Sequence, residues 1–144
     1  MVRTVGLAHF SLSVSDVAKS IAFYRDILGM EMINRVGDRM AFLRCGKDIF
    51  VIVRSDNAVE AAAKTPEQCH QAFIVEARDF DESVHSLEQA GVDVVKVETR
   101  EEFDSVFRGR SCYFRDPDGN VLEVIDLATT AHRPVERVSP ASVS

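Results

Sequence analysis

Apolar and polar residues alternate along residues 5–15, a pattern that predicts a β-strand. Over residues 17–28 the apolar positions instead recur at helical spacing, which predicts an amphipathic helix. Asp16 is a suitable N-terminal cap for this helix, and Gly29 is a suitable C-terminal stop. Three further strands are predicted at residues 30–36, 39–45 and 48–54.

The same order of elements recurs in the second half of the chain. His9 and His70 stand at matching places in two strands, and Gly29 and Gly91 end two matching helices. The second set consists of strand 69–76, helix 79–90 capped by Asp79, and strands 92–98, 110–116 and 120–126. The sequence therefore predicts an α+β fold of two βαβββ modules.

A four-stranded sheet covered by one helix has a second face to bury. Two such mixed sheets can face each other and enclose a cavity, with the helices outside. A chain of 144 residues predicts a single domain, which we expect over 1–126. Its predicted parts are module 1 at about 5–54, a linker at 55–66, module 2 at about 67–126, and an irregular tail at 127–144.

Composition narrows the class of protein. The formal net charge of −6 argues against nonspecific binding of nucleic acid, and no apolar run approaches the roughly 18 residues of a membrane span. Residues 1–6 lack the apolar core of a signal peptide, and Cys45, Cys69 and Cys112 form no CxxC pair. We therefore expect a cytoplasmic protein with reduced, buried thiols and a small-molecule substrate.

Two histidines and one carboxylate are the candidate metal ligands. His9, His70 and Glu123 each fall in a predicted strand, and this ligand set can hold a divalent ion while leaving coordination positions open. Strand alternation places His9 on the face opposite Phe10, away from the predicted helix. Glu123 lies between apolar neighbours, where an unpaired carboxylate is costly to bury and a metal ion would remove the cost.

Tyr113 and Ser111 share one face of the strand beside Glu123. Either side chain could hydrogen-bond a substrate oxygen, and Tyr113 could act as an acid, although a tyrosine there could equally be amphipathic core. The other candidate substrate-binding residues are Ser11, Ile49, Val51, Lys96 and Arg110. His85 and His132 are expected to be solvated.

The segments Ala22–Gly29 (AFYRDILG) and Tyr113–Glu123 (YFRDPDGNVLE), together with His9, resemble the vicinal oxygen chelate superfamily of glyoxalases, bleomycin-resistance proteins and extradiol dioxygenases. The resemblance implies two βαβββ modules and a divalent metal that chelates two vicinal oxygens. It also implies a homodimer with module-swapped sites. In such a dimer His9 would come from one chain, and His70 and Glu123 from its partner.

Departures from the superfamily patterns separate its branches. Val51 stands where glyoxalase I-like enzymes usually place a fourth ligand, a glutamate, which disfavours that activity. The extradiol signature fits Tyr113, the Asp116-Pro117-x-Gly119 turn and Glu123, but residues 104–107 lack the histidine expected before the tyrosine. Fosfomycin-resistance thiol transferases are similar in the positions of Ser11, Lys96, Ser111 and Tyr113.

Of three functions that the residues allow, the sequence favours the first. The first is Fe(II)- or Mn(II)-dependent dioxygenation of a catechol-like substrate, with Tyr113 assisting; the ligand types also accept Ni, Co or Zn. The second is thiol transfer or epoxide opening, with Ser11, Lys96, Ser111 and Tyr113 holding an anionic substrate. The third is a ligand-sequestering binding protein without turnover.

Overall fold

The computed structural model describes residues 1–57, 59, 65–66, 68–100 and 108–127. Module 1 contains β1 (His9–Val14), α1 (Val17–Ala22), the π-helical turn η1 (Phe23–Ile27), β2 (Glu31–Val36), β3 (Met40–Cys45) and β4 (Asp48–Arg54). Module 2 contains β5 (Gln71–Ile74), the short 3-10 turn η2 (Ala77–Asp79), α2 (Phe80–Gln89), β6 (Val94–Arg100), β7 (Gly109–Arg115) and β8 (Val121–Leu127).

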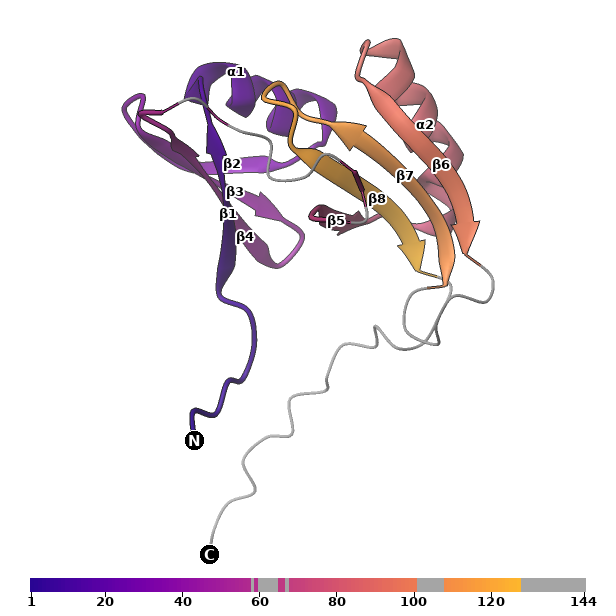
Figure 1. Cartoon of the computed structure of the whole chain (residues 1–144), viewed down its shortest axis with the longest axis horizontal. Helices are drawn as coiled ribbons and strands as arrows, with labels where there is room; N and C mark the ends of the chain where they lie inside the picture. The colour runs from indigo at the N-terminus through magenta and orange to yellow at the C-terminus, as the bar shows by residue number, and fades with distance from the viewer. Residues whose placement is uncertain (58, 60–64, 67, 101–107, 128–144) are drawn as a thin grey trace, which may run out of the picture.

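Each module forms one four-stranded mixed sheet, which confirms the predicted fold class. Sheet 1 has the order β1-β4-β3-β2 and sheet 2 has the order β5-β8-β7-β6 (Figure 1). In each sheet the first strand of the module pairs in parallel with the last, while the other neighbours are antiparallel. Among the described residues, no helix combines the length and apolar content that a membrane crossing requires.

The first helix begins as predicted but ends differently. The Asp16 carboxylate caps it by accepting a hydrogen bond of 2.9 Å from the Lys19 amide. The α-helical part stops at Ala22 and continues as the wider turn η1, which brings the adjacent rings of Phe23 and Tyr24 into the core. Gly29 ends the turn at φ +68°, a conformation that glycine adopts without steric cost.

Several predicted boundaries need correction. The strand predicted from residue 5 begins only at His9, and Val5 and Leu7 before it are exposed. His70 lies just before β5 rather than inside it. Asp79 belongs to the η2 turn, and its side chain makes no capping hydrogen bond. Half of the predicted linker and all of the tail after Leu127 fall outside the described residues.

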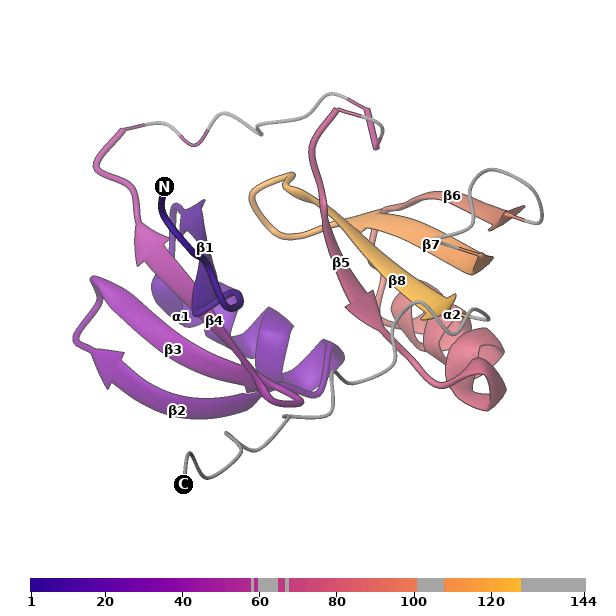
Figure 2. The ribbon, with the colours of Figure 1, turned by 90° about the horizontal axis from the view of Figure 1, so that it is seen from below.

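The helix-bearing faces of the two sheets meet in one hydrophobic core. The Phe50 ring stacks on Phe10 of β1 at 4.8 Å and meets Phe73 of β5 edge-on at 6.1 Å between ring centroids. The rings of Phe23 and Phe114 lie 6.5 Å apart and join α1's side of the core to sheet 2. Figure 2 shows the end of α1 reaching toward α2. The opposite face of each sheet, here called its helix-free face, therefore points away from this core.

The turn between β7 and β8 fastens module 2 to module 1. The buried Tyr24 hydroxyl donates a 2.7 Å hydrogen bond to Asp116 Oδ2, while Asp116 Oδ1 accepts from the amides of Asp118 and Asn120 at 2.9 Å. The Ser15 amide donates to the Asp118 carboxylate at 3.0 Å. The DPDG segment thus joins the two modules as well as turning the chain.

Replacing Tyr24 by phenylalanine should weaken this junction. A hydrogen bond to a charged group contributes about 1.5–3 kcal/mol, and we expect a loss near about 1.5 kcal/mol because Asn120 Nδ2 still donates to Asp116 Oδ2. Urea denaturation followed by circular dichroism measures the free energy of unfolding. A midpoint equal to that of the wild type would show that this hydrogen bond does not stabilise the junction.

Candidate metal centre

Glu123 and His70 form a close pair on the helix-free face of sheet 2. Glu123 lies inside β8, where its side chain is only 3% exposed, and its Oε2 lies 2.8 Å from His70 Nε2. Its other oxygen, Oε1, is buried and has no hydrogen-bond partner among the described residues. An unsatisfied carboxylate oxygen in this setting is costly, so the site favours an added cation or proton donor.

The histidine ring is oriented by its second nitrogen. His70 Nδ1 lies 2.5 Å from the Pro66 carbonyl oxygen, and because a carbonyl can only accept, Nδ1 carries the proton. In neutral imidazole Nε2 is then an acceptor, and it faces a carboxylate oxygen that is also an acceptor. Two acceptors at this distance need a proton or a metal ion between them. Orientation of a ligating histidine through its other nitrogen is the usual arrangement in metal sites.

The separation of the two donors fits neighbouring ligands of one ion. Ligands about 2.1 Å from an octahedral metal lie about 3 Å apart when they are adjacent. His70 Nε2 and Glu123 Oε2 are close to this separation. The donor set, the spacing and the unpaired oxygen therefore all fit a divalent ion bound by these two residues.

The third predicted ligand, His9, lies on sheet 1 rather than beside His70 and Glu123 on sheet 2. His9 is exposed on the helix-free face of sheet 1, with Ser11 on the same face, and its backbone is in register with Ile49 of β4. Val51 is in register with Ser11 and is largely buried. Over the described part of the chain, no three His, Cys, Asp or Glu side chains come close enough to hold a metal. A single chain therefore brings together two of the three predicted ligands.

Tyr113 lies directly beside the His70–Glu123 pair. It is opposite Glu123 in the β7–β8 register, 1% exposed, and its ring meets the His70 ring edge-on at 5.4 Å. Burial raises the pKa of the Tyr113 phenol, and the negative charge of Glu123 raises it further, while Arg100 opposes both. Tyr113 is thus held in its protonated form.

Strand β6 adds three charged side chains to this face. Lys96 is in register with Tyr113, and Glu98 with Ser111, whose buried hydroxyl has no partner among the described residues. The Arg100 guanidinium donates a hydrogen bond to the Tyr113 hydroxyl. Lys96 was predicted as a substrate-binding residue, whereas Glu98 and Arg100 were not. Glu98 lay inside the predicted strand, and Arg100 lay beyond its predicted end at residue 98. The alternating charges of Lys96, Glu98 and Arg100 were the available signal.

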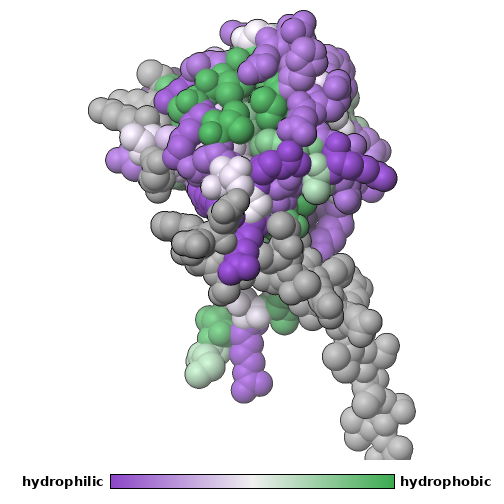
Figure 3. Space-filling model, turned by 90° about the vertical axis from the view of Figure 1, so that its right-hand side faces the viewer, coloured by the Kyte–Doolittle hydropathy of each residue, from purple (hydrophilic) through white to green (hydrophobic). Residues whose placement is uncertain are grey.

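β6 is also one of the two edge strands of its sheet, and it exposes Val95 and Val97. Figure 3 looks at this side of the molecule and shows apolar surface surrounded by polar side chains.

Arg110, which was predicted to bind substrate, lies on the face of β7 opposite the one that carries Tyr113. Its guanidinium pairs with Asp126 at 2.7 Å and with Asp81 at 2.9 Å, and it stacks over the Phe80 ring at 4.5 Å from the centroid. All three partners lie on the helix-bearing side or at its edge. Arg110 therefore anchors α2 to sheet 2 and does not reach the face that carries Glu123.

The cysteines only partly match expectation. Cys112 is buried, and burial raises the pKa of its thiol to about 11. Cys45 is half-buried, whereas Cys69, beside His70, is exposed rather than buried. His85 on α2 is exposed, as predicted.

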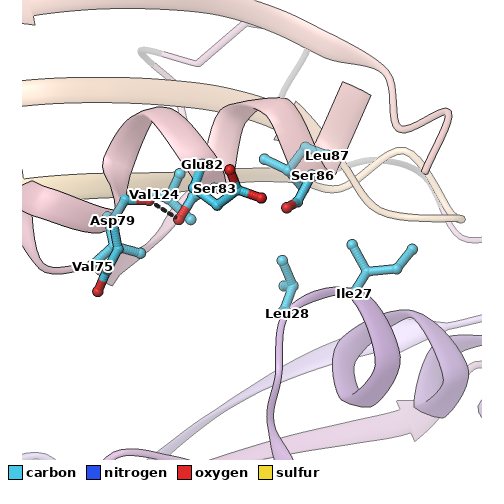
Figure 4. A pocket seen from close by; sticks show the side chains of 9 residues that line it. All are labelled: Ile27, Leu28, Val75, Asp79, Glu82, Ser83, Ser86, Leu87 and Val124. Carbon is cyan, nitrogen blue, oxygen red and sulfur yellow. Dashed lines mark hydrogen bonds between the residues drawn. The ribbon is translucent and has the colours of Figure 1, made fainter. Parts of the chain in front are cut away.

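A pocket of about 270 Å³ lies on the other side of sheet 2 from Glu123 (Figure 4). Ile27 and Leu28 at the end of η1 face Ser83 and Ser86 of α2 across it. None of the predicted ligands or substrate-binding residues lines this pocket. The chemistry-bearing residues are instead on the helix-free faces.

The sequence model of the Glyoxalase/Bleomycin resistance protein/Dioxygenase superfamily matches residues 6–124. The chain belongs to this superfamily. The match spans both modules, from just before β1 into β8, and so includes His9, His70 and Glu123.

Several superfamily members are similar to this chain over most of their length. It is 37% identical over 119 residues to glutathione transferase FosA of Serratia marcescens, covering 82% of this chain and 78% of that protein. It is 31% identical to metallothiol transferase FosB of Staphylococcus epidermidis, covering 83% and 81% of the two chains.

A solved structure of a superfamily member has the same fold. A variant of the fosfomycin resistance protein FosX of Listeria monocytogenes, in complex with Mn(II) and 1S,2S-dihydroxypropylphosphonic acid, superimposes with a TM-score of 0.70. It is 26% identical to this chain, and the match covers 85% of this chain and 90% of that one.

The two tyrosines of this chain, Tyr24 and Tyr113, provide a test of the electrostatics inside the fold. Burial raises the pKa of both Tyr24 and Tyr113 above the ordinary 10.0, so neither should ionise appreciably at pH 10.0 in the native state. Since the chain contains no tryptophan, phenolate absorbance in a pH titration reports these residues clearly.

The same shift has a consequence for stability. The pKa values of the two tyrosines are higher in the folded state than in the unfolded state. Their contribution to the free energy of unfolding is therefore fully present below about pH 10 and is lost as the pH rises further.

The Tyr24→Phe variant isolates Tyr113 in the absorbance titration. Half-ionisation of Tyr113 near pH 10 in the folded variant would contradict the described environment.

Proposed function

We propose that this chain is a divalent-metal-dependent enzyme that opens the epoxide ring of a small phosphonate, with a thiol such as glutathione as the nucleophile. The observation that carries the proposal is the buried His70–Glu123 pair, with its unpaired oxygen, beside Tyr113 and the cations Lys96 and Arg100. The similarity to glutathione transferase FosA supports the choice of reaction.

The ion would be held by His70 and Glu123, with His9 as the third ligand. When bound, a divalent ion supplies positive charge that stabilises the negative charge developing on the epoxide oxygen as its bond to carbon breaks. The thiolate sulfur forms the new bond to that carbon, and the oxygen takes up a proton. Mn(II) is the first ion to test, because the FosX complex contains it.

Tyr113 would donate a hydrogen bond in this reaction. A guanidinium can only donate, so in its contact with Arg100 the Tyr113 oxygen is the acceptor. The proton of Tyr113 therefore remains available to an oxygen on the same face, of Glu123 or of a substrate. Its raised pKa keeps this proton in place at neutral pH.

The phosphonate would bind among the polar side chains of β6 and β7. Lys96 and Arg100 supply positive charge, and the buried Ser111 hydroxyl supplies a hydrogen-bond partner. From the facing sheet, Ser11, Ile49 and Val51 would line the same cavity.

We infer a homodimer in which the helix-free face of sheet 1 from one chain covers that of sheet 2 from its partner. This arrangement is supported by the exposure of His9 and Ser11 in the single chain, where the helix-bearing faces are already packed together. It would enclose a cavity between the helix-free faces, leave the helices outside that cavity, and deliver His9 to the partner's His70 and Glu123.

Ring-cleaving dioxygenation, the first of the sequence-based functions, has less support. The relatives described above carry the names of thiol transferases and fosfomycin resistance proteins. Water in place of a thiol is a second candidate nucleophile, because the FosX complex holds a vicinal diol of a phosphonate.

Metal binding provides the first test. After reconstitution with Mn(II), the wild type should bind one ion per chain, and His70→Ala and Glu123→Gln should each weaken binding by more than about 100-fold, beyond what loss of a mere supporting partner costs. His85→Ala, on the exposed side of α2, is the matched control and should bind like the wild type. Unchanged affinity in the first two variants would remove these residues as ligands. Absence of binding in the wild type would favour a ligand-sequestering protein.

Turnover provides the second test. With Mn(II), fosfomycin and glutathione, mass spectrometry should detect a glutathione adduct, and Tyr113→Phe should reduce kcat about 100-fold, as loss of a single donor to a developing oxyanion does. A diol formed equally fast without thiol would identify water as the nucleophile. Oxygen consumption with catechols, and no product from fosfomycin, would overturn the proposal in favour of a dioxygenase.

A further inference from the structure

Glu98 occupies a central position between two cations on the helix-free face of sheet 2. Its Oε2 contacts Lys96 Nζ, and its Oε1 lies 3.0 Å from Arg100 Nε. The three residues alternate along β6 and so project from the same face of the strand. Glu98 and Arg100 are about three-quarters buried, whereas Lys96 is nearly half exposed.

This charged triplet adjoins the polar groups of the candidate site. Lys96 is in register with Tyr113, which is in register with Glu123, and Glu98 is in register with Ser111. Arg100 reaches back along the face to the Tyr113 hydroxyl. The N–H groups best placed to hold an anion beside Tyr113 are therefore the ones that already contact Glu98.

The electrostatics of this face favour a negative charge where Glu98 lies. Hydrogen bonding from Lys96, and in smaller part from Arg100, lowers the pKa of the Glu98 carboxyl and keeps it ionised. When a divalent ion offsets the charge of Glu123, Glu98 remains as the carboxylate that faces both cations. An incoming anion must then compete with it.

We propose that Glu98 is a built-in competitor for the anionic group of the substrate, holding Lys96 and Arg100 in the free protein and releasing them when a dianion binds. The inference rests on the proposed function, because it concerns the phosphonate subsite of that same site. A phosphonate dianion has more charge and more acceptor oxygens than a carboxylate, so it can replace Glu98 at both cations. A ligand with a single carboxylate only replaces the contacts of Glu98 with equivalent ones, so its binding is not favoured over the contacts already present. Glu98 thereby selects dianionic substrates over monoanionic ones.

The test is equilibrium binding of methylphosphonate and of acetate to the full-length protein, measured by isothermal titration calorimetry with and without Mn(II). Glu98→Gln keeps the shape of the side chain but removes the competing charge, so it should tighten methylphosphonate binding by about three- to thirtyfold. It should also make acetate binding detectable. Asp38→Asn is the matched control, because it removes an exposed carboxylate that pairs with Arg54 at the turn between β2 and β3, and it should leave both affinities unchanged.

The Arg100→Gln variant tests whether the cation that Glu98 contacts also binds the substrate anion. It should weaken methylphosphonate binding, because it removes a cation that the dianion needs. Unchanged or weaker binding in Glu98→Gln would overturn the proposal, since Glu98 would then align the cations for substrate rather than compete with it. Absence of methylphosphonate binding in both the wild type and Glu98→Gln would overturn it as well. If Glu98→Gln fails to fold by circular dichroism, Glu98→Thr removes the same charge with a residue suited to a strand.

The two proposals fail in distinguishable ways, because this assay contains neither an epoxide nor a thiol. Tighter methylphosphonate binding in Glu98→Gln without any turnover of fosfomycin would support the anion subsite and contradict the proposed reaction. Turnover by the wild type, together with unchanged methylphosphonate binding in Glu98→Gln, would support the reaction and contradict the competitor role of Glu98.

Discussion

The packing of the two helix-bearing faces against each other constrains every other part of this chain. Phe10, Phe50 and Phe73 contact one another across the modules, and Tyr24 reaches Asp116 in the far turn. With these faces buried, the helix-free faces must point outward. His9 and Glu123 lie on those outward faces, so the core that stabilises one chain also keeps the predicted ligands of that chain apart. We therefore infer that a second chain completes the site.

Sheet 2 carries His70 and Glu123, and the described residues alone do not satisfy the polar atoms of this buried pair. Glu123 is almost fully buried, one of its oxygens has no partner among the described residues, and the other faces a histidine nitrogen whose partner nitrogen already carries the proton. A divalent ion would satisfy both oxygens and the imidazole lone pair at once. Tyr113, Ser111 and the cations of β6 share the face of sheet 2 that carries Glu123.

Local patterns were sufficient to predict the modules. Strand alternation correctly separated His9 and Ser11 from Phe10 and Leu12, and the Asp16 cap and Gly29 stop were found where expected. The internal repeat predicted two copies of one βαβββ unit, which the sheet orders confirm.

What the sequence left undetermined depends on contacts between distant segments. The π-helical turn at Phe23 arises because two adjacent rings are drawn into a core shared with module 2. Arg110 turns toward Asp81 and Asp126, which strand spacing could not reveal. Arg100 was missed because pairing with β7 extends β6 beyond its predicted end. The meeting of His9 with His70 and Glu123 stays a prediction, because it depends on packing between the sheets of two chains.

The sharing of the metal centre between two chains can be measured directly in a mixed dimer. One chain carries His9→Ala and the other His70→Ala, with different affinity tags so that only mixed dimers are recovered. In a swapped dimer both lesions fall in one site, and the other site keeps all three native ligands. We predict that each variant alone binds no Mn(II), whereas the mixed dimer binds a single ion. A mixed dimer that binds no Mn(II) would contradict the account, because each site would then take all of its ligands from one chain.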